Sequence, residues 1–243
     1  MIRLGINIDH VATLRNARGE NHPNLYQVAK YIMKLGANSI TIHLREDRRH
    51  IKDNDLKILS KDNKIPLNLE ICSNKKMLSM ALKYKPNYVC IVPEKRNEVT
   101  TEGGLNLTKN KKKIKTLVSL LKKKKIRTSL FINPNINDIK ISRYVKTDCI
   151  EIHTGKISRL IKSKKNFIKE FKKIKKCSKY AKSIGLEVHA GHGMDYKTTK
   201  ILSKIKEIKE FNIGHFIIGE SINFGLKKVL NKIKKITNSK WKL

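Results

Sequence analysis

The sequence predicts an α/β fold of the (β/α)8 TIM-barrel class, in which a closed barrel of eight parallel strands is surrounded by outer helices. Apolar segments of strand length alternate with amphipathic helical segments eight times along the chain. The strand segments are apolar at nearly every position, as in parallel strands that are buried on both faces. The length of 243 residues suits one such barrel, which typically has roughly 250 residues. Because no linker divides the chain, we expect residues 1–243 to form a single domain.

The first half of the chain contains four strand and helix units. Strands are expected at residues 4–8, 39–44, 67–71 and 88–92. The first strand is expected to run into a loop, and helices are expected at residues 24–35, 53–60 and 75–83. Gly36 follows the first of these helices directly, which is typical of a helix C-cap.

The second half repeats the pattern. Ile114, Leu117, Val118 and Leu121 keep the i, i+3, i+4, i+7 spacing of an amphipathic helix. Strands are then expected at residues 128–132, 149–153, 186–190 and 212–218. Further helices are expected at residues 136–145 and 167–184, through Ile201 and Ile205, and over 226–233. This completes the eight units.

The chain is strongly basic, with 55 Lys and Arg against 20 Asp and Glu and a formal net charge of +35. Much of the excess lies in lysine runs at 111–113, 122–125 and 172–176, which are interleaved with Ile and Leu on amphipathic helices. Such runs are typical of solvated helix faces. Aromatic residues make up only 6% of the chain and form no stripe on which bases could stack. We therefore expect no specific nucleic-acid partner.

The four cysteines are Cys72, Cys90, Cys149 and Cys177, and no two of them form a C-x-x-C pair. We expect them to be reduced core residues rather than part of a disulfide framework or zinc knuckle. Met1 leads directly into the first strand without the apolar stretch of a signal peptide, and no segment approaches the length of a membrane span. We therefore expect a cytoplasmic protein with no membrane partner.

Polar and ionisable side chains stand at or just past the end of nearly every predicted strand. In order along the chain they are Asn7, Asp9, His10, His43, Arg45, Glu70, Glu94, Lys95, Arg96, Asn133, Glu151, His153, His189, His192, Gly214 and His215. A single His or Glu at a strand end is more often structural than catalytic. In a parallel barrel, however, all these ends meet on one face. Their convergence predicts an enzyme with one shared pocket.

Two sets of residues predict phosphate binding at this face. Glycine-containing turns at 190–193, 212–215 and 218–221 lie around the last two strands, where barrels often cradle phosphate, although the turns could also be purely structural. Cations for a second phosphate follow the first two strands, namely Arg15, Arg18, Arg45, Arg48, Arg49 and His50. Two phosphate-binding regions on one face suit the condensation of two phosphorylated molecules. Residues 93–105, with a Gly-Gly pair, are expected to form a lid or a static surface loop.

Several long motifs resemble those of the pyridoxine 5'-phosphate synthase family. They are NIDHVATLRNARG at 7–19, HLREDRRHI at 43–51, VPEKR at 92–96, TTEGG at 100–104, EIHTG at 151–155, AGHG at 190–193 and NIGH at 212–215. The match runs through the whole chain in order. The resemblance implies a (β/α)8 barrel that joins 1-deoxy-D-xylulose 5-phosphate to 3-amino-2-oxopropyl phosphate, with release of phosphate and water.

The resemblance also implies roles for individual residues. The general bases correspond to His43 and Glu70, the proton donor to His192 and the transition-state stabilising carboxylate to Glu151. The contacts to the amino-ketone phosphate correspond to Asn7, Arg18, Gly193, Gly214 and His215. The contacts to deoxyxylulose phosphate correspond to Asp9, His10, Arg45, His50 and Thr100. No metal and no organic cofactor is implied, and family members assemble from dimers into homo-octamers, as tetramers of dimers.

The chemistry fits these residue types, because ring formation requires several proton transfers between groups of near-neutral pKa. Two other functions remain possible at this stage. A metal-dependent barrel hydrolase or abasic-site endonuclease would use zinc ligands drawn from His10, His43, Glu70, Glu151, His153 and His192, although no H-x-H or H-E-x-x-H motif supports it. A non-catalytic RNA-binding protein would depend on the basic charge alone.

Overall fold

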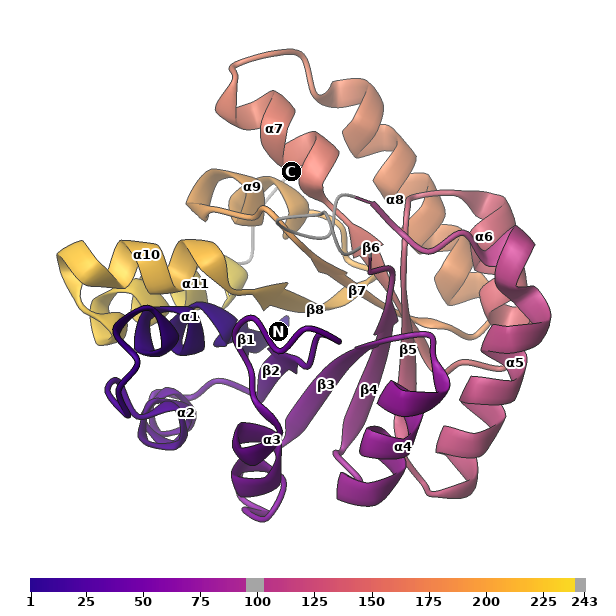
Figure 1. The fold of residues 1–243 in the computed structure, drawn as a ribbon. Helices are drawn as coiled ribbons and strands as arrows, with labels where there is room; N and C mark the ends of the chain where they lie inside the picture. Colours follow the sequence, from indigo (N-terminus) through magenta and orange to yellow (C-terminus); the bar gives the residue numbers. More distant parts are fainter. Residues whose placement is uncertain (95–102, 239–243) are drawn as a thin grey trace.

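The fold is a closed barrel of eight parallel strands, seen in a computed structural model that describes residues 1–94 and 103–238 (Figure 1). Each strand pairs with the next in sequence, and β1 pairs with β8 to close the ring. The strands are β1 (Arg3–Asn7), β2 (Ser39–His43), β3 (Leu67–Cys72), β4 (Tyr88–Val92), β5 (Arg127–Ile132), β6 (Cys149–His153), β7 (Glu187–Gly191) and β8 (Ile208–Ile213). The predicted fold class is confirmed.

Helices surround the barrel and connect its strands (Figure 1). They are α1 (Asp9–Arg18), α2 (Leu25–Lys34), α3 (Asp53–Leu59), α4 (Lys75–Tyr84), α5 (Leu107–Lys123), α6 (Ile136–Tyr144), α7 (Gly155–Lys162), α8 (Ile168–Ser183), α9 (Tyr196–Leu202), α10 (His215–Phe224) and α11 (Leu226–Asn238). Local sequence sets several of their ends. For example, the Asn24 side chain accepts a hydrogen bond from the Gln27 N–H at the start of α2, and Gly36 follows its end with a φ of +87°. None of the described helices is both long and apolar enough to span a membrane.

Side chains alternate between the two faces of each strand. Along β2, Ile40 and Ile42 are fully buried against the helices, whereas Thr41 and His43 belong to the inward-facing set. The large apolar core therefore lies between the barrel and its helices. Inside the barrel, the described apolar residues form only a small cluster of Cys90, Val92 and Phe131. Most of the remaining interior is polar, which leaves it available for hydrogen bonding and proton transfer.

The first seven predicted strands are confirmed, with each end within one residue of the observed one. The eighth prediction is wrong, because β8 ends at Ile213 and the apolar residues 216–218 belong to α10. Three short helices were also not predicted. Helix α1 occupies the expected first loop, and α7 and α10 follow β6 and β8 directly. Helix α10 begins two residues after β8, so its apolar residues continue the strand pattern, whereas α1 has few apolar residues and α7 is only eight residues long.

The four cysteines are buried and free, as expected.

Candidate active site

The carboxyl ends of the strands bring a group of ionisable side chains together, and we call this end of the barrel the mouth. His43, the last residue of β2, lies between the carboxyl groups of Glu70 and Glu94. Its Nδ1 is 3.8 Å from Glu70 Oε2, and its Nε2 is 3.5 Å from Glu94 Oε2. All three side chains are at least 85% buried, with exposed fractions of 5%, 15% and 3%. His43 Nε2 and Glu94 Oε2 are buried and have no hydrogen-bond partner among the described residues, so proton exchange between the ring and the two carboxyl groups requires these contacts to shorten.

The end of β1 fixes the position of His43 from the other side. Asp9 Oδ1 accepts a hydrogen bond of 2.8 Å from the His43 backbone N–H, and Asp9 Oδ2 accepts one of 2.9 Å from Asn7 Nδ2. His50 lies nearby, with Nδ1 3.8 Å from Asp9 Oδ1. Because His50 Nδ1 also accepts a hydrogen bond of 2.9 Å from the Ile51 N–H, this nitrogen carries no proton. Burial lowers the pKa of His50, in agreement with a neutral ring.

Glu94 connects His43 to the cationic loop after β2. Its Oε1 accepts a hydrogen bond of 3.0 Å from the Glu46 N–H and lies 3.7 Å from Arg45 Nε. Burial acts to raise the pKa of Glu94, but the His43 contact, the Glu46 N–H and Arg45 outweigh it, so the pKa is lowered. The charged form of Glu94 is therefore favoured. Sequence reasoning placed it at a strand end but gave it no role.

Two other carboxyl groups have raised proton affinity. Burial, followed by the negative charges of Glu151 and Asp9, raises the pKa of Glu70 well above its usual range. Burial also raises the pKa of Glu151, to about 7, although His189 and a hydrogen bond from Asn212 act in the opposite direction. Carboxyl groups with a raised pKa are typical of proton-transfer sites.

A chain of hydrogen bonds inside the barrel orients Glu151. Asn212 Nδ2 donates to Glu151 Oε2 at 2.7 Å, while Asn212 Oδ1 lies 3.5 Å from the Thr41 hydroxyl. Asn68 Nδ2 in turn donates to Thr41 Oγ1 at 3.2 Å. These hydrogen bonds determine that the Nδ2 of Asn212, rather than its Oδ1, faces Glu151. Sequence reasoning missed Asn212 because it placed the residue at the start of the last strand instead of near its end.

His192 forms another side of the mouth, together with Gly193. It has a φ of +77°, in the left-handed region, and the Thr154 hydroxyl lies 2.7 Å from the carbonyl oxygens of both Gly191 and His192. The centroid of the His192 ring is 4.9 Å from that of the His153 ring. His153 was predicted at a strand end without a role. Burial, with the positive charges of Arg159 and Lys162, lowers the pKa of His192. The ring therefore releases a proton readily.

The start of α10 contributes a third set of residues beside β1. The rings of His10 and His215 lie 4.7 Å apart, and a Cβ on Gly214 would approach Asn7 Cβ to 2.8 Å. None of the side chains that the structure describes caps the N-terminus of α10. Backbone N–H groups at such a helix start attract anions. The structure therefore brings Asn7, His10, Gly214 and His215 together where phosphate binding was predicted.

Some predicted cations have other partners. Arg15 was expected to contact phosphate, but it is buried and donates to Asp55 Oδ1 and Oδ2 at 2.5 and 2.9 Å, so this expectation is wrong. Arg48 contacts Asp53 and Arg49 contacts Asp47, each at 2.7 Å. Arg18 has a side chain that is 79% exposed, and it pairs with Glu20 outside the buried cluster. These pairings depend on the folded geometry and could not be predicted from the sequence.

Two further expectations concern Thr100, together with the predicted lid, and His189. Thr100, a predicted substrate contact, lies outside the described residues, as do residues 95–102 of the predicted lid. His189 was expected at the strand ends, but its side chain contacts Glu187, at the opposite end of β7, at 2.8 Å. It therefore lies deeper in the barrel than the mouth residues.

Two groups of described residues have spacings that a metal ion could use. The ligand atoms of Asp9, His43 and Glu70 lie within 4.8 Å of one another, and so do those of Cys149, Glu187 and His189. The first group includes two of the predicted catalytic residues. This spacing is the observation that favours the alternative function, a metal-dependent hydrolase or endonuclease.

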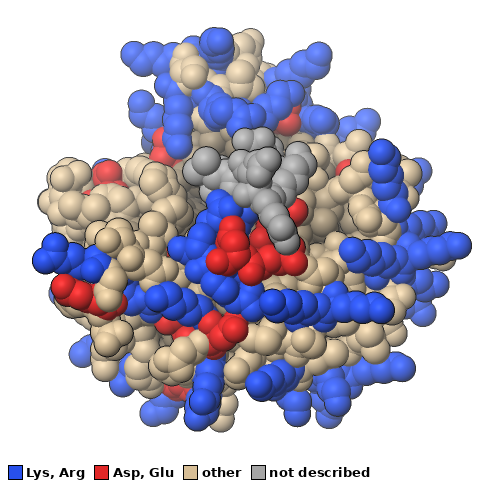
Figure 2. All heavy atoms as spheres, in the orientation of Figure 1, with Lys and Arg blue, Asp and Glu red and all other residues tan. Residues whose placement is uncertain are grey.

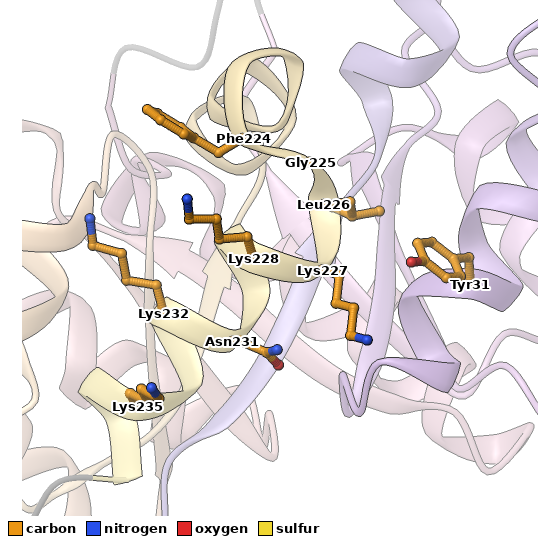
Figure 3. Close-up of a pocket in the computed structure, with 9 residues that line it drawn as sticks. All are labelled: Tyr31, Phe224, Gly225, Leu226, Lys227, Lys228, Asn231, Lys232 and Lys235. Atoms are coloured by element: carbon orange, nitrogen blue, oxygen red, sulfur yellow. The ribbon is translucent and has the colours of Figure 1, made fainter.

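Outside the mouth, the surface formed by the described residues offers no equally specific site. Figure 2 shows Lys and Arg spread over the visible face rather than gathered in one groove, with a group of acidic residues near its centre. A hollow lies beside the start of α11, and its lining includes Tyr31, Phe224, Leu226 and several lysines (Figure 3). None of the predicted catalytic residues lines this hollow.

Comparison with known proteins gives a consistent result. The model of the family described as "Pyridoxal phosphate biosynthesis protein PdxJ" matches residues 4–239. The pyridoxine 5'-phosphate synthase of Pelagibacter ubique (strain HTCC1062) is 64% identical over 238 residues, which cover 98% of this chain and 100% of that protein. The pyridoxine 5'-phosphate synthase of Bdellovibrio bacteriovorus is 45% identical and covers 97% of this chain and 98% of its own length.

Solved structures with little sequence similarity share the fold. A 3-hexulose-6-phosphate synthase from Salmonella typhimurium aligns with a TM-score of 0.64 at 11% identity, covering 97% of this chain and 98% of that one. The tryptophan synthase A-subunit from Pyrococcus furiosus aligns with a TM-score of 0.61 at 13% identity, covering 98% of each chain. At this identity the similarity extends to the barrel architecture alone.

Proposed function

This chain belongs to the pyridoxine 5'-phosphate synthase family of vitamin B6 biosynthesis, and we propose that the mouth of its barrel joins 1-deoxy-D-xylulose 5-phosphate to 3-amino-2-oxopropyl phosphate. The products are pyridoxine 5'-phosphate, inorganic phosphate and water. One observation carries the assignment of this reaction to the mouth. His43 lies between Glu70 and Glu94, in the same buried interior as Glu151, whose pKa is near 7.

The reaction requires protons to move at several atoms. The amine of one substrate must condense with a carbonyl of the other, carbon-bound protons must be removed, and oxygen must leave as water and as phosphate. Each step needs an acid or a base within hydrogen-bonding reach. Because the groups at the mouth differ in proton affinity, some can hold protons and others can accept them at the same pH.

We assign the base steps to His43 and Glu70. Glu70 holds a proton more tightly than an ordinary carboxyl group, because it is buried near the charges of Glu151 and Asp9. When Glu70 is ionised, it can accept the proton that the His43 ring has taken up, since its Oε2 is 3.8 Å from His43 Nδ1. Glu94, on the Nε2 side of the ring, stabilises the imidazolium that forms in between.

We assign the acid step to His192 and charge stabilisation to Glu151. The lowered pKa of His192 makes its protonated ring a strong donor toward a departing oxygen. Condensation of an amine with a ketone passes through a positively charged iminium group. A carboxylate at Glu151, held in place by Asn212, would stabilise that charge where it develops.

The two phosphate groups would bind on different sides of the mouth. We propose that Asn7, Gly193, Gly214 and His215, with Arg18, contact the amino-ketone phosphate. The uncapped start of α10 and the close approach of Gly214 to Asn7 support this choice. We propose that Asp9, His10, Arg45, His50 and Thr100 contact deoxyxylulose phosphate. Asp9, as a carboxylate, suits a sugar hydroxyl rather than the phosphate.

The proposal includes neither a metal ion nor an organic cofactor, and it places the enzyme in the cytoplasm. We propose further that it assembles as a homo-octamer, a tetramer of dimers, without a specific nucleic-acid or membrane partner. Light scattering after size-exclusion chromatography would test this assembly, with an expected mass of eight times 28.0 kDa. A monomer mass would contradict it.

The decisive experiment for the reaction is incubation of the purified protein with both substrates. We expect new ultraviolet absorbance from the pyridine ring and one phosphate released per ring, with the same rate in the presence of a chelator. Absence of ring formation would contradict the proposal. Chelator-sensitive hydrolysis of phosphate esters or DNA would instead support a metal ion at Asp9, His43 and Glu70.

A further inference from the structure

A second ionic cluster lies inside the barrel at its other end, which we call the floor. It consists of Arg3, Arg127, Glu187, His189 and Glu210, from strands β1, β5, β7 and β8. His189 Nε2 is 2.8 Å from Glu187 Oε1, and Arg127 Nη2 is 3.0 Å from the same oxygen. Arg3 also pairs with Glu187, and its Nε is 2.9 Å from Glu210 Oε2. The floor therefore joins three cationic groups to two carboxylates.

The His189 ring is held as a cation. Its Nε2 lies 2.8 Å from Glu187 Oε1 and 3.4 Å from Arg3 Nη2, so the carboxylate is the nearer neighbour, and its Nδ1 lies 3.5 Å from Glu210 Oε1. A neutral imidazole has only one N–H, so its other nitrogen would direct a lone pair at a carboxylate. Burial acts to lower the pKa of His189, but hydrogen bonds to Cys149 and Glu187 and the charge of Glu210 raise it to about 10. With its side chain only 8% exposed, His189 is a buried positive charge at neutral pH.

The floor has little capacity for a metal ion, although Cys149, Glu187 and His189 have suitable spacing. Glu187 Oε1 already accepts from Arg3, Arg127 and His189. A metal ion at this oxygen would lie close to two guanidinium groups and would require His189 to lose its proton. The floor carboxylates are already neutralised by the two arginines and His189, so they do not need a metal ion.

His189 is also a neighbour of Glu151 in the barrel wall. The two residues are register partners on the parallel strands β6 and β7, so their side chains belong to the same inward-facing set. Both line one enclosed cavity between the mouth and the floor, together with Asn68, Ser129 and Glu210. The charge of His189 therefore acts on Glu151 across the polar barrel interior, where it is screened less than at the surface.

We propose that His189 is a positioning residue, whose fixed positive charge beneath the mouth keeps Glu151 ionised during ring formation. The inference rests on the proposed function, in which Glu151 acts as a carboxylate. The groups around Glu151 have opposing effects. Asn212 on β8 and His189 on β7 favour its charged form, whereas Glu210 on β8 and Glu70 on β3 disfavour it, and the thiols of Cys90 and Cys149 lie in the same interior.

Two substitutions in the floor test this balance, because they should shift the pKa of Glu151 in opposite directions. His189→Gln removes a positive charge near Glu151 and leaves Glu187 paired with Arg3 and Arg127. Glu210→Gln removes a negative charge and leaves His189 paired with Glu187. Neither residue is assigned a substrate contact. Side chains of similar size replace the originals, so a purely structural effect would have the same sign in both variants.

The measurement is the pH profile of kcat, together with KM for each substrate. In His189→Gln we expect the acidic limb to move about one pH unit upward, with a roughly tenfold lower kcat below the limb. The rate should recover to within about threefold of wild type near pH 9, since Glu151 is then ionised again. In Glu210→Gln the limb should move downward. KM should change less than about twofold in both variants.

A titration that needs no turnover separates this inference from the proposed function. Carbon-13 NMR of labelled glutamate side chains, with Glu151 assigned from the Glu151→Gln variant, reports the ionisation of Glu151 directly. We expect its midpoint to rise in His189→Gln and to fall in Glu210→Gln. Shifts of the same sign, or no shift in either variant, would overturn the inference even in an active synthase. A stoichiometric metal ion that is lost in His189→Gln would also overturn it.

Discussion

The mouth and the floor of this barrel contain the same kinds of buried side chain, but they differ in how completely the charges are paired. At the floor, His189, Arg3 and Arg127 lie within 3.0 Å of a carboxylate oxygen. At the mouth, the His43 contacts with Glu70 and Glu94 are 3.8 and 3.5 Å. The floor contacts have the length of charge-assisted hydrogen bonds, whereas the mouth contacts are longer.

The difference has consequences for protonation. At the floor the carboxylate is fixed in its charged form, since His189 and Arg3 lower the pKa of Glu187 despite burial. At the mouth, burial and neighbouring negative charges raise the pKa of Glu70 and Glu151. Buried ionisable residues are therefore not enough to identify an active site in this molecule. What distinguishes the mouth is that its charges are incompletely compensated, so that protons can move.

The largest expected effect is at the mouth. Glu70→Gln keeps the shape of the side chain but removes its ability to exchange a proton, so we expect kcat to fall by about a thousandfold. The melting temperature should stay the same or rise, because the substitution removes the cost of burying an ionisable group. Steady-state kinetics and thermal unfolding of the same sample would measure both quantities.

The matched control is Glu207→Gln, which makes the same chemical change in the loop before β8, outside the mouth and the floor cluster. It should leave kcat within about twofold of wild type, as expected for a surface substitution. Near-normal turnover of Glu70→Gln would show that the raised pKa of Glu70 is not used in the reaction.

The next effect in size is at the floor, and it is an effect on stability. Glu187→Gln removes the carboxylate that Arg3, Arg127 and His189 share. Arg127 then loses the carboxylate that it contacts, and the buried His189 keeps only Glu210, at 3.5 Å, so we expect a loss of about 3 kcal/mol in the free energy of unfolding, measured by urea denaturation. Since the cluster is partly exposed, with Glu187 at 27%, water will limit the loss. A stability equal to that of wild type would contradict the view that the floor is structural.

The sequence predicted most of the barrel because its strands are short apolar segments with clear boundaries. It failed where a strand is followed at once by a helix. Phe216, Ile217 and Ile218 extend the apolar run of β8, yet only Ile217 is buried, as on one face of a helix. Helix α1 was missed for the opposite reason. Its polar sequence has few apolar residues, and its buried face includes Arg15, which pairs with Asp55.

The site was predicted at the level of residue types and the strand ends that hold them. The pairings between residues were not predictable, because they join positions far apart in the chain. Glu94 meets His43 across 51 positions of sequence, and Asn212 meets Glu151 across 61 positions. The depth of His189 was also not predictable, since it depends on how β7 is aligned in the barrel. Sequence reasoning therefore identified the mouth but could not separate it from the floor.

The smallest expected effect compares an arginine at each end of the barrel. Arg45→Lys keeps the charge at the mouth but loses the planar group that can bind phosphate with two hydrogen bonds, so KM for deoxyxylulose phosphate should rise about tenfold. Arg127→Lys makes the same change at the floor, where the arginine contacts Glu187. It should leave KM unchanged and lower the melting temperature slightly.

These two variants test the comparison directly, because the chemical change is identical and only its position differs. Initial rates at varied deoxyxylulose phosphate, with the other substrate saturating, give KM, and thermal unfolding gives stability. If Arg127→Lys raised KM as much as Arg45→Lys, the two ends of the barrel would be coupled through substrate binding. The floor would then be part of the active site, and incomplete charge pairing would no longer be the feature that marks where this enzyme acts.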